Sequence, residues 1–132
     1  MSNIVALTEA ASIGLHSMVL IARSDEVLNV LKISEFIGSS KHHVAKIMQR
    51  LSKAGFVSSN RGPSGGFVLK QLPSEITLLN IYEAIEGPLS VQTCPMDRPT
   101  CPFGECLLGD LSLRVSGEIR EYLAGRTLQD YL

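Results

Sequence analysis

The sequence predicts a mainly helical fold that contains one small β-hairpin and ends in a long helix. Only 5% of the 132 residues are aromatic and none is tryptophan, although 45% are apolar. Such a composition gives an aliphatic core and disfavours aromatic-rich sandwiches and barrels. Apolar residues recur at helical spacing along most of the chain, and one stretch shows two β-type runs around a glycine-rich turn. The length suits one domain with an extension.

Helical patterns account for the first forty residues. Thr8 is the predicted N-cap of a mostly apolar first helix at about 8–24. A polar turn at 24–29 precedes a short helix at 32–37, and Gly38 stops that helix. We therefore expect two helices before the tight turn that follows Gly38.

A third helix is predicted at 41–54, with Ser39 or Ser40 as its N-cap and Gly55 after its end. Its apolar stripe has i, i+3, i+4, i+7 spacing and consists of Val44, Ile47, Met48 and Leu51. Its opposite face is polar and carries His42, Lys46, Gln49, Arg50 and Lys53. Two helices around a tight turn form a helix-turn-helix, whose second helix enters a DNA major groove. A surface helix of an enzyme would show the same periodicity.

A β-hairpin is predicted directly after this helix. Short strands at 56–59 and 67–70 flank the glycine-rich segment 60–66. Glycines let backbone amides approach a phosphate, and Arg61 adds positive charge at the tip. Without the preceding helix pair, an ordinary flexible loop would explain the segment equally well. With it, residues 1–87 are predicted to form a winged helix-turn-helix domain.

The rest of the chain is predicted to hold a cysteine loop and a dimerisation helix. Thr77 caps a helix that runs to Glu86, and an irregular, proline-containing loop follows at 89–104. A long helix is expected at 106–124, then a terminal turn at 128–132. The stripe of this helix has no unassigned partner within one chain, so a second subunit is expected to supply it; it consists of Leu108, Leu111, Val115, Ile119 and Tyr122. The predicted divisions are 1–87, a cluster-binding loop at 88–106, and 107–132.

The charges are segregated along the chain. Residues 36–74 contain no acidic residue and carry +6, so the remainder carries −7 in a chain of net charge −1. Segregation of this kind is typical of a protein with one face toward phosphate, although a solvated basic surface without a partner would look the same. The longest apolar stretch, 13–22, is interrupted and shorter than the ~20 residues of a membrane span. No basic region precedes it, so we expect no secretory signal, a cytoplasmic location and no membrane partner.

Three cysteines lie within thirteen residues of the predicted loop, as Cys94, Cys101 and Cys106. An odd count without a secretory signal argues against a disulfide framework. Prolines at 95, 99 and 102 keep the segment irregular, so all three thiols can converge on one centre. Thiolates select zinc, Cu(I) or iron–sulfur centres, and zinc is disfavoured because paired short-spaced cysteine knuckles are missing. A disulfide switch without metal, or three incidental thiols, would also account for them.

Three cysteines leave a cluster one ligand short. Among protein side chains the candidates are Glu9, His16, His42 and His43, and an external ligand such as water or a small thiol is the alternative. A lone histidine on an apolar helix, as at His16, is more typical of a hydrogen-bonded core residue. His42 and His43 are predicted to face DNA instead.

The chain resembles the iron–sulfur winged-helix transcription regulators, a family that includes IscR and NsrR. The most specific match is the wing, Arg61-Gly62-x-x-Gly65-Gly66-Phe67-x-Leu69, with the segments 76–78 and 84–87 after it. Residues 51–57 and 125–130 match as well, so the resemblance spans essentially the whole chain. It implies a homodimer held by the C-terminal helix and a cluster held by the three cysteines.

The resemblance also bears on the fourth ligand. In the family, the partner subunit's first helix can supply it at a position that falls on Glu9, whereas other members use a histidine three residues after the third cysteine. Gly109 stands at that place here, which favours Glu9. The cysteine spacing, six residues and then four, differs from the near-even pattern of well-known members, so a 2Fe-2S and a 4Fe-4S cluster both stay open.

The sequence thus predicts a homodimeric DNA-binding regulator, most simply a repressor, that senses redox state, nitric oxide or iron–sulfur status. The alternatives are a cluster-free thiol-sensing repressor and a metal-binding winged-helix protein-interaction module. No enzyme is expected, because no nucleophile–base pair, phosphate loop or catalytic carboxylate pair is found. Predicted ligands are Cys94, Cys101, Cys106 and Glu9. The predicted contacts to double-stranded DNA are Ser40, Lys41, His42, His43, Lys46, Gln49, Arg50, Arg61, Gly62, Ser64 and Gly65.

Overall fold

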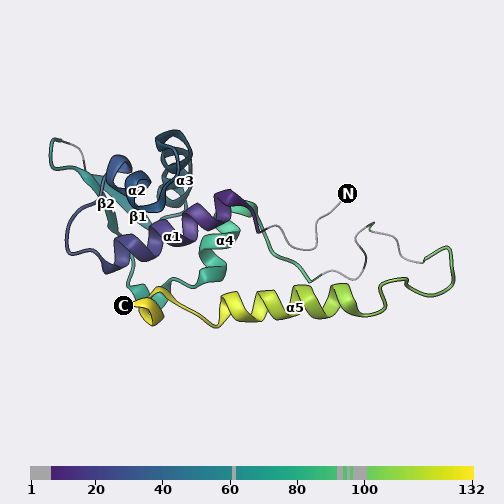
Figure 1. Cartoon of the computed structure of the whole chain (residues 1–132). Coiled ribbons are helices and arrows are strands. Elements are labelled where there is room, and N and C mark those ends of the chain that lie inside the picture. Colours follow the sequence, from purple (N-terminus) through teal and green to yellow (C-terminus); the bar gives the residue numbers. More distant parts are fainter. Residues whose placement is uncertain (1–6, 61, 92–93, 95, 97–100) are drawn as a thin grey trace.

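The computed structural model describes residues 7–60, 62–91, 94, 96 and 101–132. Within them the fold is mainly helical, with a two-stranded antiparallel sheet (Figure 1). The prediction of a mainly helical fold with one small β-hairpin is therefore confirmed, whereas the long C-terminal helix is not. The elements are α1 (Glu9–Arg23), α2 (Val30–Ile37), α3 (Lys41–Lys53), β1 (Val57–Asn60), β2 (Gly66–Leu69), the 3₁₀ turn η1 (Pro73–Glu75), α4 (Leu78–Glu86), α5 (Leu111–Ala124) and the 3₁₀ turn η2 (Leu128–Tyr131).

Side-chain caps set the helix starts. Thr8 accepts a hydrogen bond from the Ala11 amide, and Ser40 accepts one from the His43 amide. Helix α2 begins two residues before the predicted start, because the Asn29 side chain accepts from the Lys32 amide at 2.8 Å. Gly38 and Gly55 follow α2 and α3 with φ of 83° and 89°, left-handed values that glycine adopts without steric cost.

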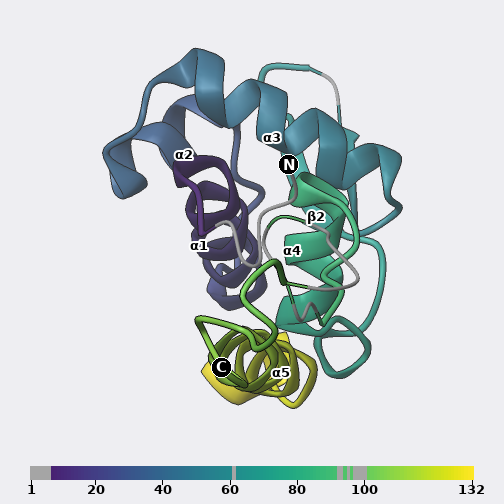
Figure 2. The same cartoon turned by 90° about the vertical axis from the view of Figure 1, so that its right-hand side faces the viewer.

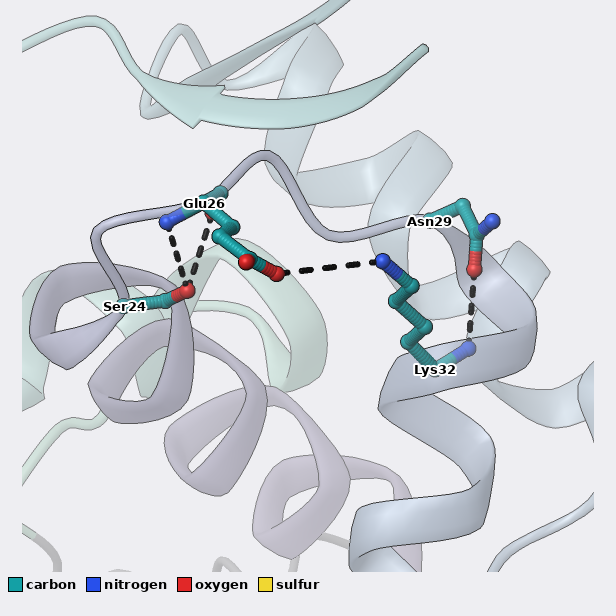
Figure 3. A network of polar contacts seen from close by, with 4 residues as sticks. All are labelled: Ser24, Glu26, Asn29 and Lys32. Atoms are coloured by element: carbon teal, nitrogen blue, oxygen red, sulfur yellow. Dashed lines mark hydrogen bonds and ion pairs between the residues drawn. The ribbon is translucent and has the colours of Figure 1, made fainter. Parts of the chain in front are cut away.

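The connector between α1 and α2 is held by a small polar network (Figure 3). The Ser24 hydroxyl donates to the Glu26 carbonyl at 2.9 Å and accepts from the Glu26 amide at 3.1 Å. The Glu26 carboxylate lies 3.9 Å from the Lys32 ammonium. Leu28, next along the connector, forms an antiparallel bridge with Phe67 of β2. The connector is therefore tied to the hairpin at this one bridge.

Helix α1 lies at the centre of the domain, with α3 on one side of it and α5 on the other (Figures 1 and 2). It packs on α2, α3 and α4, and α5 packs on α4. The predicted stripe of α3 is buried as expected, with Val44, Met48 and Leu51 fully covered. The C-terminal end returns to the segment before α4, where the Leu128 amide donates to the Ile76 carbonyl at 3.0 Å. One aliphatic core therefore connects all the helices.

Helix α5 is shorter than the sequence predicts. We expected it to begin at about Cys106, but it begins at Leu111. Residues 107–110 form turns instead, with Gly109 at φ 59° and its amide donating to the Cys106 carbonyl at 3.1 Å. The left-handed glycine prevents a continuous helix through this point. No helix among the described residues is long and apolar enough to cross a membrane.

One polar group in the core offers a test of the packing. Ser17, in the middle of α1, is fully buried, and its hydroxyl has no hydrogen-bond partner among the described residues. An unsatisfied buried hydroxyl costs about 1–3 kcal/mol, and alanine is a better helix former. We expect Ser17→Ala to raise the free energy of unfolding by about 1 kcal/mol in urea titrations.

Ser34→Ala is the matched control for this prediction. Ser34 is also buried in a helix, but its hydroxyl donates to the Leu31 carbonyl at 2.9 Å. Removing a satisfied hydroxyl should bring no such gain. A loss of stability in Ser17→Ala would show that this hydroxyl is satisfied in solution.

Candidate nucleic-acid interface and cysteine segment

The first turn of α3 presents a basic, exposed surface. Lys41, His42 and His43 are exposed, and no acidic residue lies in this turn. Ser40 caps the helix with a 3.2 Å bond from the His43 amide. The partial positive charge of a helix N-terminus adds to the charge of the side chains. Lys46 and Gln49 continue the exposed face along the helix.

The wing lies beside α3 on the side of the domain that faces away from α5 (Figures 1 and 2). Its strands pair with Val57 opposite Leu69 and Asn60 opposite Gly66, one residue from the predicted strand ends. At the tip, the Gly65 amide donates to the Gly62 carbonyl at 2.9 Å. Gly62 and Ser64 are exposed. Arg61, which the sequence assigned to this tip, lies outside the described residues.

Arg50 differs from the other predicted groove residues in its contacts. Its Nη1 donates to the Ile85 carbonyl at 2.8 Å, in the last turn of α4. This bond directs part of the guanidinium toward the domain, although the residue as a whole is exposed. Sequence periodicity places Arg50 on the polar face but gives no sign of this tertiary bond.

The N-terminus of α1 contacts both α3 and α4. A carboxylate oxygen of Glu9 lies 3.8 Å from Nδ1 of His43. The Thr8 hydroxyl donates to the Glu86 carboxylate at the end of α4. His16, a second candidate ligand, is exposed and its Nδ1 donates to the Ser12 carbonyl at 2.7 Å. The expectation that His16 is a core residue is therefore wrong, because it lies on the outer face of α1.

The three cysteines lie between α4 and α5 in the chain. Cys94 and Cys101 are half-buried and Cys106 is exposed. The Gly104 amide donates to the Cys101 carbonyl at 3.1 Å, so the chain turns between the second and third cysteine. In the described part of the chain, no three cysteine, histidine or acidic side chains are gathered as a metal site. By donor chemistry, thiolates in an irregular segment still suit an iron–sulfur centre.

The start of the cysteine segment is fixed by contacts that the sequence did not reveal. The Leu89 amide donates to the Glu83 carboxylate at 2.8 Å, and its carbonyl accepts from Nη1 of Arg120 at 2.5 Å. Leu89 itself is only 4% exposed. These bonds join residues up to 31 positions apart, which local patterns cannot predict. The sequence shows only that an apolar residue, Leu89, directly follows Gly87-Pro88.

Comparison with known proteins agrees with this architecture. The chain is 30% identical over 107 residues to the HTH-type transcriptional repressor NsrR of Streptomyces coelicolor, covering 80% of this chain and 72% of the repressor. Its fold matches CymR, the global cysteine regulator of B. subtilis, with a TM-score of 0.79, 27% identity and coverage of 96% and 95% of the two chains. It also matches IscR of T. potens, with a TM-score of 0.73, 24% identity and coverage of 96% and 85%.

Residues 7–132 match the family model described as Rrf2, iron-dependent transcriptional regulator. This match spans both the winged helix-turn-helix and α5, and it confirms the resemblance found in the sequence. Members of this family are DNA-binding transcription regulators rather than enzymes. The chain belongs to the Rrf2 family of transcriptional regulators.

Proposed function

We propose that this protein is a homodimeric repressor that binds a palindromic DNA operator. Its affinity for the operator is set by an iron–sulfur cluster on Cys94, Cys101 and Cys106. The observation that carries the proposal is the layout of the domain. The exposed face of α3 and the wing lie on one side, α5 lies on the other, and the cysteine segment connects α4 to α5. A change in that segment can therefore alter the dimer without touching the DNA surface directly.

The DNA contacts would come from the exposed polar residues of α3 and the wing. Lys41, His42, His43, Lys46 and Gln49 would face the major groove, and Ser40 would lie at the helix cap. The wing, with Arg61, Gly62, Ser64 and Gly65, would hold phosphate or the minor groove. Arg50 differs from these residues because its guanidinium already donates to the Ile85 carbonyl.

The three thiolates would hold a cluster of two or four irons, with Glu9 of the other subunit as the fourth ligand. When bound, the cluster supplies a centre that responds to redox state, nitric oxide or iron supply. Leu89, at the start of this segment, is anchored to Glu83, and the chain turns between Cys101 and Gly104. Because two recognition helices must be about 34 Å apart on DNA, a small shift between subunits changes affinity strongly.

Anaerobic purification tests this function. We expect coloured protein with bound iron and sulfide, and an operator affinity that changes at least tenfold when the cluster is removed. A variant with Cys94→Ser, Cys101→Ser and Cys106→Ser should be colourless and should show one fixed affinity under all conditions. Fluorescence anisotropy with labelled duplex measures the operator affinity of both proteins. An unchanged response in the triple variant would rule the cysteines out as the sensor.

A cluster-free thiol switch is the second candidate. It is favoured by the exposed Cys106, because an accessible thiol is open to oxidation. Colourless, iron-free protein whose DNA affinity still responds to oxidant would support it. Failure to bind any duplex at low salt would instead favour a protein-interaction module, because phosphate contacts strengthen as salt falls.

A further inference from the structure

The C-terminal end of α4 is a junction between the recognition helix and the cysteine segment. Ile85 is the penultimate residue of α4. The cysteine segment, residues 88–106, begins three residues after it. Its carbonyl is one of the last four of the helix, which have no partner within the helix. Nη1 of Arg50 on α3 donates to it at 2.8 Å. Arg50 therefore joins α3 to the point where the cysteine segment leaves the domain.

This bond has favourable electrostatics. The last turn of α4 contains no basic residue of its own, so the guanidinium of Arg50 brings a positive charge from α3 to the negative end of this helix. The bond is half-buried, so water competes for it less than for a surface pair. A charge-assisted hydrogen bond in such a place is stronger than a neutral one.

The same end of α4 is also fixed to the cysteine segment and to α5. The Glu83 carboxylate accepts from the Leu89 amide and lies 3.9 Å from Arg120, which in turn donates to the Leu89 carbonyl. A displacement of the segment at Leu89 therefore acts on Glu83, which lies two residues before Ile85 in the last turn of α4. Because Arg50 on α3 is hydrogen-bonded to the Ile85 carbonyl in that turn, a movement of the turn also moves α3.

A second route runs through the N-terminus of α1, by Thr8 with Glu86 and by Glu9 with His43. The Glu9 and His43 side chains are 69% and 58% exposed, and their atoms are 3.8 Å apart. Exposed pairs of this kind contribute little. The Arg50 bond is shorter and better shielded, so it is the stronger of the two links.

We propose that Arg50 is a positioning residue that couples the state of the cysteine segment to the orientation of α3, rather than only a contact to DNA. This inference rests on the proposed function, in which the cysteine segment controls operator binding. It assigns a role to a predicted groove residue whose guanidinium is bound to the protein itself.

The test compares coupling rather than affinity alone. Operator affinity is measured for anaerobically cluster-loaded protein and for the triple cysteine-to-serine protein, each with Arg50, Arg50→Met or Arg50→Lys. Methionine keeps the length of the side chain and removes its donors, and lysine keeps one donor group. Lys53→Met, an exposed residue at the end of the same helix, removes the same charge without this bond.

We expect Arg50→Met to reduce the ratio of the two affinities at least fivefold. Arg50→Lys should keep about half of the native ratio. Lys53→Met should leave the ratio within twofold of the native value. Hydrogen exchange gives a second readout, because amide protection in α3 should respond to cluster loading in the native protein and not in Arg50→Met. If Arg50→Met folds poorly by circular dichroism, Arg50→Gln replaces it and should give a ratio between those of methionine and arginine.

Several results would overturn the inference. An unchanged ratio in Arg50→Met would do so. An equal loss of affinity in both forms, with a weaker salt dependence, would identify Arg50 as a simple phosphate contact. Equal affinities of the cluster-loaded and the triple cysteine-to-serine protein, both with Arg50, would refute the proposed function itself, and this inference with it. A native ratio that survives Arg50→Met would refute the inference alone.

Discussion

Replacing Gly66 by alanine should destabilise the domain by about 3 kcal/mol, at the upper end of overpacking costs, and weaken DNA binding at least tenfold. A Cβ at this position would lie 2.5 Å from the carbonyl oxygen of Leu28 and 2.8 Å from the Val27 side chain. The Leu28 backbone cannot move aside easily, because its carbonyl accepts from the Phe67 amide at 2.8 Å. The wing must therefore move away from the connector. Urea denaturation and anisotropy with the operator would measure the two effects.

Gly117→Ala is the matched control for this prediction. Gly117 lies in α5, where an added Cβ would meet nothing within 4 Å. Alanine is favoured over glycine in a helix by up to about 1 kcal/mol, so this variant should be equally stable or more stable. If Gly66→Ala instead folded with native stability and bound the operator normally, the bridge between Leu28 and Phe67 would have no role in holding the wing.

The sequence was sufficient for those features that depend on local chemistry. Thr8, Ser40 and Thr77 cap their helices as predicted, and Gly38, Gly55 and Gly87 follow helix ends with positive φ. The stripe of α3 was predictable because one helical period decides which side chains are buried. These features need only a few neighbouring residues, which a single sequence contains.

Features that depend on tertiary contacts were not predictable in the same way. The bond from Arg50 to Ile85 and the anchoring of Leu89 join distant positions through single hydrogen bonds, which leave no periodic pattern. The start of α5 was placed five residues too early because apolar spacing continues through Leu107 and Leu108, while Gly109 turns the backbone. The ligand role of Glu9 and the DNA contacts stay predictions.

The exposed stripe of α5 carries the second large expected effect. Leu111, Val115 and Tyr122 are 45%, 39% and 53% exposed, an unusual density of apolar surface for one helix. The neighbouring side of the helix, about 100–140° around its axis from Leu111, is covered by α4, with Ser112 and Ser116 buried there. Small serines allow α5 to pack closely on α4, and the larger apolar side chains are left for another subunit. This arrangement supports the proposed dimer.

We expect Leu111→Asp to convert the protein to a monomer and to weaken binding to a palindromic operator about 100-fold, because a monomer occupies one half-site only. A buried carboxylate at a subunit interface is costly when it has no partner. Leu113→Asp is the matched control, since Leu113 is also 45% exposed but points about 200° away around the helix. Sedimentation and anisotropy measure the two effects. A dimer that tolerates Leu111→Asp but not Leu113→Asp would place the subunit contact on the other face of α5, and a dimer that tolerates both would exclude this helix from the interface.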